Sequence, residues 1–160
     1  MDAIELKFDP VQWEKVRQRL RRPFWDRSVT KMVRTLTEDM EKVAKHEAYP
    51  HPGQDTGSIR DSIRSHMVDS WHGEIFSNKV EVKYVEFGRR PRRRMPPVDK
   101  IEEWAARHGM PGAGYMIARK IALRGTKGLQ MFRKAYDYGR MMTNSRVSAA
   151  ARDIEQLWRF

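Results

Sequence analysis

The segment that decides the predicted fold class is GEIFSNKVEVKYVEFG, residues 73–88. Two strands are expected within it, over residues 73–77 and 79–87, joined by a tight turn. The second strand alternates apolar and charged residues over positions 80–84, and successive side chains of a strand point to opposite faces. The segment therefore predicts an antiparallel hairpin with one face against a core and one face in water.

Helical periodicity surrounds this hairpin on both sides. The clearest stripe of apolar residues at 3.6-residue spacing ends near Glu47. The predicted helices cover residues 10–20, 26–47, 59–63, 97–108, 115–123, 132–136 and 147–158. Helices around a small block of strands favour an α+β fold over a parallel α/β sheet. We expect a small antiparallel sheet, made of the hairpin 73–87 and an N-terminal strand over residues 3–8, surrounded by several amphipathic helices.

The length of 160 residues fits one domain, spanning residues 1–160. Residues 137–160 are expected to form a C-terminal helical extension that docks on a neighbouring subunit. This extension carries Trp158 and Phe160. Because two large aromatic rings left in water would form an exposed apolar patch, we expect them to be covered by this chain or by another copy.

The composition excludes several classes of protein. The chain has no cysteine, which rules out disulfides, thiolate metal ligands and a cysteine nucleophile. The N-terminal residues lack the pattern of a signal peptide, and no apolar run approaches the length of about 20 residues that a membrane span needs. We therefore expect a protein that is made and used in soluble form, without a membrane partner.

Charge is distributed unevenly along the sequence. Residues 1–86 hold 15 Lys and Arg against 15 Asp and Glu, whereas residues 87–160 hold 17 against 6, so the whole net charge of +11 lies in the second part. Five arginines fall within six positions of the segment RRPRRR, residues 89–94. These arginines are Arg89, Arg90, Arg92, Arg93 and Arg94. We call them the arginine loop.

Five like charges in so short a loop repel one another, so the arginine loop is expected to have a negatively charged partner. Guanidinium groups form paired hydrogen bonds with phosphate and with carboxylate, and the residues do not decide between nucleic acid and an acidic protein surface. The sequence contains no zinc-finger, RNP or helix-turn-helix pattern, which makes sequence-specific readout of bases a poor interpretation.

The residues also allow an enzymatic interpretation. Asp69, Glu81 and Lys83 can be aligned with the acidic and Glu-x-Lys pattern of metal-dependent nucleases, in which two carboxylates hold a divalent cation. The same pattern arises in any strand with one wet face, and no histidine spacing, nucleophile elbow or phosphate-binding glycine loop accompanies it. We therefore expect no enzyme, no cofactor and no metal site, with the nuclease kept as the weakest alternative.

Several segments resemble one family in the same order. The segment 55–63 resembles the threonine-glycine-x-hydrophobic-arginine-x-serine motif of the tail-completion, or neck, proteins of long-tailed bacteriophages. The segment 84–88 is similar to the family's strand ending in glutamate-phenylalanine-glycine, which is followed by a basic loop with prolines. The helix ending at Trp104 and the closing segment 118–135 are similar to later parts of the family. Residues 137–160 fall outside the resemblance.

The resemblance implies a structural protein of the virion, in its tail or neck, that is made in the bacterial host cytoplasm. Copies would form a homo-oligomeric ring in the neck that completes the tail and helps join it to the head. The implied partners are other neck and tail proteins, such as a stopper or connector and a tail terminator or tail tube, and the genomic DNA in the channel. The alternative drawn from the residues alone is a protein that binds nucleic acid without sequence preference.

Overall fold

The computed structural model describes residues 11, 14–15, 23–48 and 57–158, with the backbone alone for residues 23–25 and 157–158. An α+β fold is present, as the sequence predicted. Its elements are α2 (Pro23–Ala48), α3 (Ser58–Ser62), β1 (Ile63–Met67), β2 (Gly73–Ser77), α4 (Val82–Phe87), β3 (Gly88–Arg89), α5 (Val98–Arg107), α6 (Gly114–Arg124), β4 (Thr126–Lys127) and α7 (Met131–Trp158).

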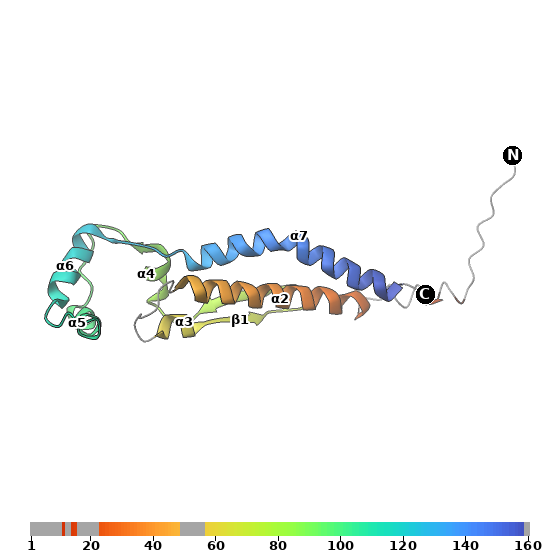
Figure 1. Cartoon of the computed structure of the whole chain (residues 1–160), viewed down its shortest axis with the longest axis horizontal. Helices are drawn as coiled ribbons and strands as arrows, with labels where there is room; N and C mark the ends of the chain where they lie inside the picture. Colours follow the sequence, from red (N-terminus) through yellow and green to blue (C-terminus); the bar gives the residue numbers. More distant parts are fainter. Residues whose placement is uncertain (1–10, 12–13, 16–22, 49–56, 159–160) are drawn as a thin grey trace, which may run out of the picture.

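Two long helices, α2 and α7, run side by side in opposite directions and form the body of the molecule (Figure 1). Lys134 Nζ at the start of α7 lies 2.6 Å from Glu47 Oε2 at the end of α2. Near the middle of the pair, Arg146 forms an ion pair with Asp39. The small residues of α7 that face α2 allow the two backbones to approach, and a Cβ added to Gly139 would lie 2.6 Å from Met40 Sδ.

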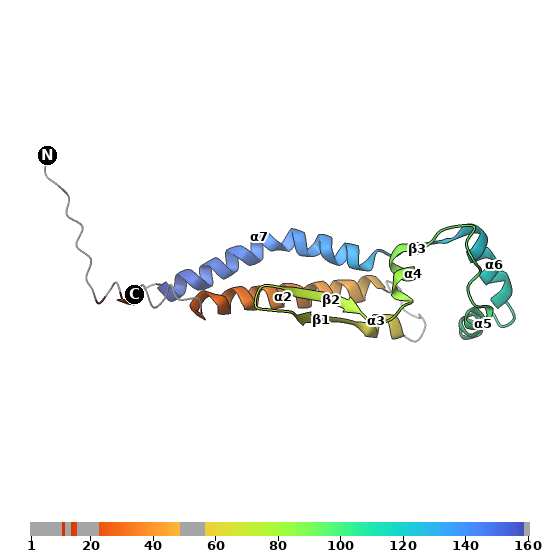
Figure 2. The same cartoon turned by 180° about the vertical axis from the view of Figure 1, so that it is seen from behind.

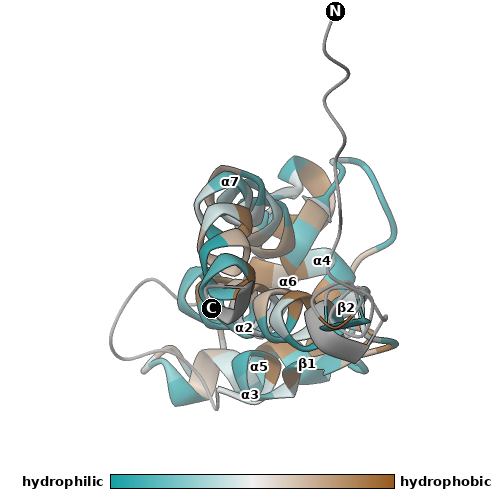
Figure 3. Cartoon of the chain, turned by 90° about the vertical axis from the view of Figure 1, so that its right-hand side faces the viewer, coloured by the Kyte–Doolittle hydropathy of each residue, from teal (hydrophilic) through white to brown (hydrophobic). Residues whose placement is uncertain are grey.

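The β1–β2 hairpin covers the side of α2 opposite α7, so that α7, α2 and the hairpin form three layers in the end-on view (Figure 3). The strands are antiparallel, with Ile63 opposite Ser77 and Met67 opposite Gly73. Gly73 is required because a Cβ there would lie 2.1 Å from Oγ1 of the buried Thr37 on α2. The hairpin is thus pressed against the helix at its turn.

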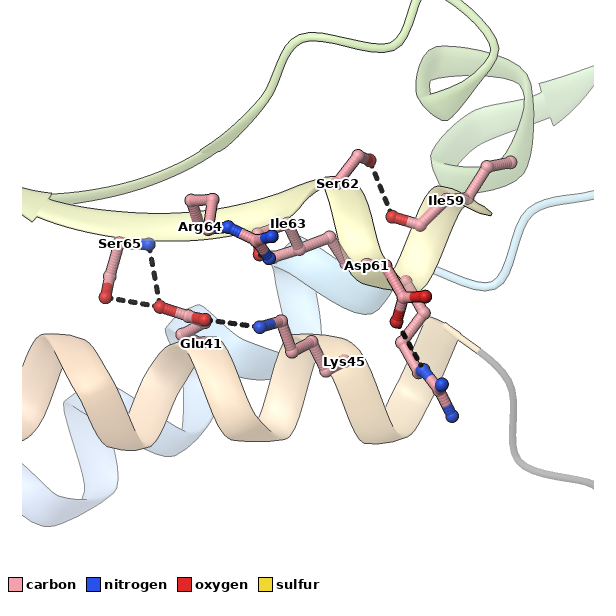
Figure 4. A network of polar contacts seen from close by, with 9 residues as sticks. Glu41, Lys45, Ile59, Asp61, Ser62, Ile63, Arg64 and Ser65 are labelled. Carbon is pink, nitrogen blue, oxygen red and sulfur yellow. Dashed lines mark hydrogen bonds and ion pairs between the residues drawn. The ribbon is translucent and has the colours of Figure 1, made fainter. Parts of the chain in front are cut away.

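Glu41 of α2 ties the hairpin to the helix at its other strand (Figure 4). Its Oε2 accepts a hydrogen bond from the backbone N of Ser65, at 2.7 Å, and another from the Ser65 hydroxyl. Its Oε1 accepts from Lys45 Nζ at 2.5 Å. Burial raises the pKa of Glu41, but the hydrogen bonds from Lys45 and Ser65 outweigh it and hold the pKa below the ordinary value of 4.5.

The predicted hairpin over residues 73–87 was wrong in its second strand. Residues 73–77 form β2, but they pair with β1 ahead of them, and residues 82–87 form the helix α4. The alternation over positions 80–84 coincides with a second pattern, since Val82, Val85 and Glu86 fall on one face of a helix. Val82 and Glu86 are buried there. The segment is helical because a helix places Val82, Val85 and Glu86 together on the face that the rest of the chain covers.

The main core lies where the end of α2 meets α3, α4 and the start of α7. Its buried apolar residues are Ala44, Ala48, Ile63, Val82, Met131 and Ala135. Among the described residues, Ile63 and Met131 are the largest side chains that are fully buried. A core of this size leaves many large apolar side chains of the body at the surface.

The chain leaves the body and returns to it through a short arm. The arm consists of residues 88–97 and 125–130, in which β3 and β4 pair antiparallel, with Gly88 opposite Lys127. Gly88 has φ +71°, and a Cβ there would lie 2.1 Å from the carbonyl oxygen of Thr126. Glycine is therefore needed at this point both for its backbone conformation and for the close approach of the two arm segments.

The arm carries a head made of α5 and α6, which stands apart from α2, α7 and the hairpin (Figures 1 and 2). Ala105 and Ala118 are fully buried between the two head helices. The Glu102 carboxylate accepts a hydrogen bond from the backbone N of Gly114 at 2.6 Å and thereby caps the start of α6. The head is therefore held by small-residue packing and one polar cap.

Residues 131–158 form one continuous helix, whereas the sequence predicted two separate helices over 132–136 and 147–158. The expected C-terminal extension, residues 137–160, is thus largely the second part of α7, and it packs on α2 of the same chain. The predicted strand 3–8, most of the predicted helix 10–20, and the side chains of Trp158 and Phe160 lie outside the described residues. Within the described residues, no helix has the length and apolar character that crossing a membrane requires.

Candidate partner-binding interface

The arginine loop runs along the arm between the body and the head. Arg89 donates a hydrogen bond from Nη2 to the carbonyl oxygen of Arg94 at 2.9 Å, which folds the loop back on itself. The backbone N of Arg93 donates to the carbonyl oxygen of Ala122 at 3.3 Å, which places the loop against the end of α6. The loop is therefore held by the Arg89 side chain and by the backbone of Arg93. The side chains of Arg90, Arg92, Arg93 and Arg94 are exposed.

Among the described residues, the arginine loop has few acidic neighbours along the chain. Residues 88–130 hold 11 Lys and Arg against 3 Asp and Glu, a net charge of +8. Two of the three acids are engaged elsewhere, since Glu102 caps α6 and Glu103 pairs with Lys100 at 3.2 Å. In the part of the chain that the structure describes, no Asp or Glu forms an ion pair with any loop arginine.

Other exposed cations extend this charge over the neighbouring elements. Because the end of α6 lies against the arginine loop, the exposed basic residues of α6 and β4 belong to the same region of the molecule. They are Arg119, Lys120, Arg124 and Lys127. We call these four residues together with the arginine loop the basic surface. It presents nine cationic side chains at the arm and the adjoining helix.

Glu86 fixes the point from which the arm leaves the body. Its side chain is 5% exposed, with Oε2 accepting from the backbone N of Phe132 at 2.9 Å and Oε1 from that of Arg133 at 3.1 Å. These N–H groups belong to the first turn of α7, where a helix lacks internal acceptors and carries partial positive charge. The Glu86 carboxylate thus caps a helix that begins 45 positions later in the sequence.

An apolar patch lies beside this cap. Val80, in the turn before α4, is 67% exposed, and Tyr84 and Phe87 on α4 are 44% and 81% exposed. The Nζ of Lys83 and the Cζ of Arg89 each lie 5.0 Å from the centre of the Tyr84 ring, at cation–π distance. We call Val80, Tyr84 and Phe87 the α4 patch. Exposed aromatic rings with flanking cations are typical of surfaces that bind a partner.

The structure lacks the strand on which the alignment with metal-dependent nucleases depends. Glu81 and Lys83 were expected on one face of a strand, but residues 82–87 are helical and Glu81 precedes that helix. Asp69 lies in the turn between β1 and β2, where its Oδ1 accepts from the backbone N of Trp71. Among the described residues, no three His, Asp or Glu side chains are grouped in a way that could hold a metal ion.

In the structure four of the five predicted loop arginines are exposed and Arg89 is half-buried. Glu86 and Phe87 were not singled out from the sequence as candidate site residues. Both lie in the glutamate-phenylalanine-glycine segment that carries the resemblance described above. The available signal was the spacing of Glu86 four positions after Val82, which places a charged residue on the buried face of a short helix. Such a residue is buried only when a specific partner satisfies it.

Comparisons of the chain with protein-family models, with curated proteins and with solved structures found no match.

Proposed function

We propose that this chain is a structural subunit that functions by assembly, as one copy of a ring in the neck of a long-tailed bacteriophage. The ring would complete the tail and help join it to the head around the DNA passage. The observation that carries the proposal is the arginine loop, which is held by hydrogen bonds to the carbonyl oxygens of Arg94 and Ala122 while its side chains have no carboxylate partner among the described residues. An assembly partner would supply the missing negative charge.

Exposed apolar side chains of both the body and the head support the same proposal. Large apolar side chains are exposed on α4, α6 and α7, with Phe87, Met116 and Met141 at 81%, 65% and 70%. Aromatic residues, methionine and arginine are the types enriched at protein–protein contacts. In a closed ring, cyclic symmetry brings copies of the basic surface together around one axis, so carboxylates or phosphates of neighbours must offset their repulsion.

The test of this role replaces all five loop arginines by serine in a phage that encodes the chain. We expect heads and tails to form but to stay apart, counted as unjoined particles by electron microscopy. The matched control replaces Arg133 and Arg140 by serine, because these exposed arginines of α7 lie outside the arm. Normal joining of heads and tails in the loop variant would refute the role given to the loop.

A second candidate, binding of nucleic acid without sequence preference, is favoured by the nine cations of the basic surface. Each phosphate contact releases about one counterion, so affinity would fall steeply with salt. The purified chain is titrated onto duplex DNA at several salt concentrations. Tight binding whose dependence on salt concentration corresponds to several phosphate contacts would favour this candidate, if the loop variant no longer binds. Weak binding of the single chain agrees with the structural role.

A further inference from the structure

The outer face of α6 carries two rows of exposed side chains. Within each row the residues are four positions apart, so they lie one above the other on the helix surface. The first row is Tyr115, Arg119 and Leu123, and the second is Met116, Lys120 and Arg124. The large apolar members, Tyr115, Met116 and Leu123, are 54%, 65% and 57% exposed. We call these six residues the α6 face.

The packing of the head does not require these apolar side chains. The opposite side of α6 packs on α5, with Ala118 fully buried and Gly114 so close that a Cβ there would lie 2.7 Å from Cα of Glu102. The other helix of the head has no comparable face. The exposed residues of α5 are Asp99, Lys100, Glu103, Ala106 and Arg107. Large apolar side chains that the fold does not use, gathered on one helix, indicate a contact surface.

Cations lie between the apolar residues of the α6 face. In the described part of the chain, no Asp or Glu forms an ion pair with Arg119 or Lys120. An occupant without negative charge would bury these two cations unpaired. An occupant with negative charge alone would leave the three apolar side chains in water. The α6 face therefore fits an occupant that carries acidic and apolar groups side by side.

An acidic protein helix meets this requirement better than nucleic acid does. A phosphodiester backbone supplies negative charge but no apolar surface to cover Tyr115, Met116 and Leu123. On a helix, residues four positions apart recur about every 6 Å, which is also the interval within the rows of the α6 face. Rows of this spacing on two helices interdigitate in the commonest type of helix packing.

From these features we infer that the α6 face binds an acidic amphipathic helix of another protein. The inference rests on the proposed function, because it names the class of partner that the basic surface takes. Apolar residues of the bound helix would lie against Tyr115, Met116 and Leu123, while its Asp and Glu residues would pair with Arg119 and Lys120. The arginine loop lies against the end of α6, so it would meet acidic residues at one end of the same helix.

The experiment measures binding of two labelled peptides to the full chain by fluorescence anisotropy. Each peptide has about 18 residues, which is long enough to form a helix. The leucine peptide carries Leu and Glu at four-residue spacing on one face and Ala elsewhere. The serine peptide has Ser in place of every Leu and keeps the charge. Because exposed ion pairs contribute little, we expect the leucine peptide to bind with a Kd at least about tenfold lower.

Two variants of the chain separate the apolar from the ionic contribution. The combination Tyr115→Ala, Met116→Ala and Leu123→Ala should bind the two peptides alike. The combination Arg119→Ser and Lys120→Ser should bind both peptides more weakly than the unchanged chain does.

The matched control is Tyr136→Ala with Val147→Ala, two exposed apolar residues of α7, and it should keep the tenfold preference. Circular dichroism checks that each variant is folded. Alanine is a strong helix former, and Met116→Ala alone carries the test if the triple variant does not fold.

Three outcomes would overturn the inference. The first is equal affinity of the unchanged chain for the two peptides. The second is a preference for leucine that persists when the apolar residues of the α6 face are replaced. The third is a duplex of about 20 base pairs that binds more tightly than the leucine peptide at about 0.15 M salt and is unaffected by the alanine variant, which would assign the face to nucleic acid.

These outcomes are independent of the test of the proposed function. A peptide result against the α6 face leaves the joining of heads and tails to be decided by the loop variant. Normal joining in that variant would refute the role of the arginine loop in the neck, whereas a tenfold preference for the leucine peptide would still assign a helical protein partner to the α6 face.

Discussion

Glu86 shows how one buried charged residue sets the geometry of two elements. Its carboxylate satisfies two N–H groups of the first turn of α7, and its own backbone is part of α4. The position of the arm relative to the body is therefore decided by a contact between residues that are 46 and 47 positions apart. A local sequence pattern cannot indicate such a partner, which explains why residues 82–87 were predicted as a strand.

Replacing Glu86 tests this role of the carboxylate. Glu86→Ala leaves two N–H groups of α7 without acceptors, so we expect the free energy of unfolding to fall by about 2 kcal/mol. Glu86→Gln keeps one good acceptor and should lose about half as much. Both are measured by urea unfolding followed by circular dichroism. The exposed neighbour Glu81→Ala is the control and should change stability by less than about 0.5 kcal/mol. Equal losses in Glu81→Ala and Glu86→Ala would contradict the capping role.

At the scale of elements, the helices with strong apolar stripes were predictable from the sequence. The helix expected over residues 26–47 is α2, and those expected over 97–108 and 115–123 are α5 and α6, with ends that differ by one to three residues. Each of these helices has enough apolar residues at 3.6-residue spacing to be recognised alone. The prediction worked where the information was local.

That α7 is one continuous helix was not predictable in the same way. Its residues facing α2 include Ala135, Gly139 and Arg146, which recur at helical spacing but are small or charged. An apolar stripe is therefore missing between the two segments that were predicted as separate helices. The partner helix explains the pattern, because small residues permit close approach and Arg146 pairs with Asp39.

The carboxylates that join the elements predict how stability depends on pH. A hydrogen bond from Lys134 holds the pKa of Glu47 below its ordinary value of 4.5. For Glu41, burial raises the pKa, but the hydrogen bonds from Lys45 and Ser65 outweigh this effect and hold its pKa below 4.5 as well. A pKa that is lower in the folded than in the unfolded chain stabilises the fold above the unfolded value. That stability is lost as the pH falls through 4.5 and then through the lower folded values.

We therefore expect the free energy of unfolding to be nearly level from about pH 7 to about pH 5 and to fall below that. The variant Glu41→Gln with Glu47→Gln should be less stable than the unchanged chain at neutral pH and should lose less on acidification. Urea unfolding at a series of pH values measures both. A variant whose stability falls with acid as steeply as that of the unchanged chain would assign the dependence to other groups.

For the molecule as a whole, charge is separated along its length. The arm and head, residues 88–130, carry a net charge of +8, so the remaining residues contribute only +3 of the total of +11. The cations of the arm lie within a few residues of one another and repel. Salt screens such repulsion, since the Debye length falls from about 30 Å at 0.01 M to about 8 Å at 0.15 M ionic strength.

The isolated chain should accordingly become more stable when sodium chloride is raised from about 0.01 M to about 0.15 M. The variant with all five loop arginines replaced by serine should show a smaller rise in Tm, and at low salt it should melt at or above the Tm of the unchanged chain. Differential scanning calorimetry measures both effects. A lower Tm in the variant at low salt would mean that the arginines have stabilising contacts within the chain.

The double connection between body and head has a mechanical consequence. One arm segment leads into the head from α4 and the other leads back to α7, so any pull on the head is divided between two backbones. The β3–β4 hydrogen bonds run across the direction of that pull, so the pull does not break them one after another. Both backbones end at Glu86 and the turn of helix it binds, so force on the head would reach α4 and α7 together.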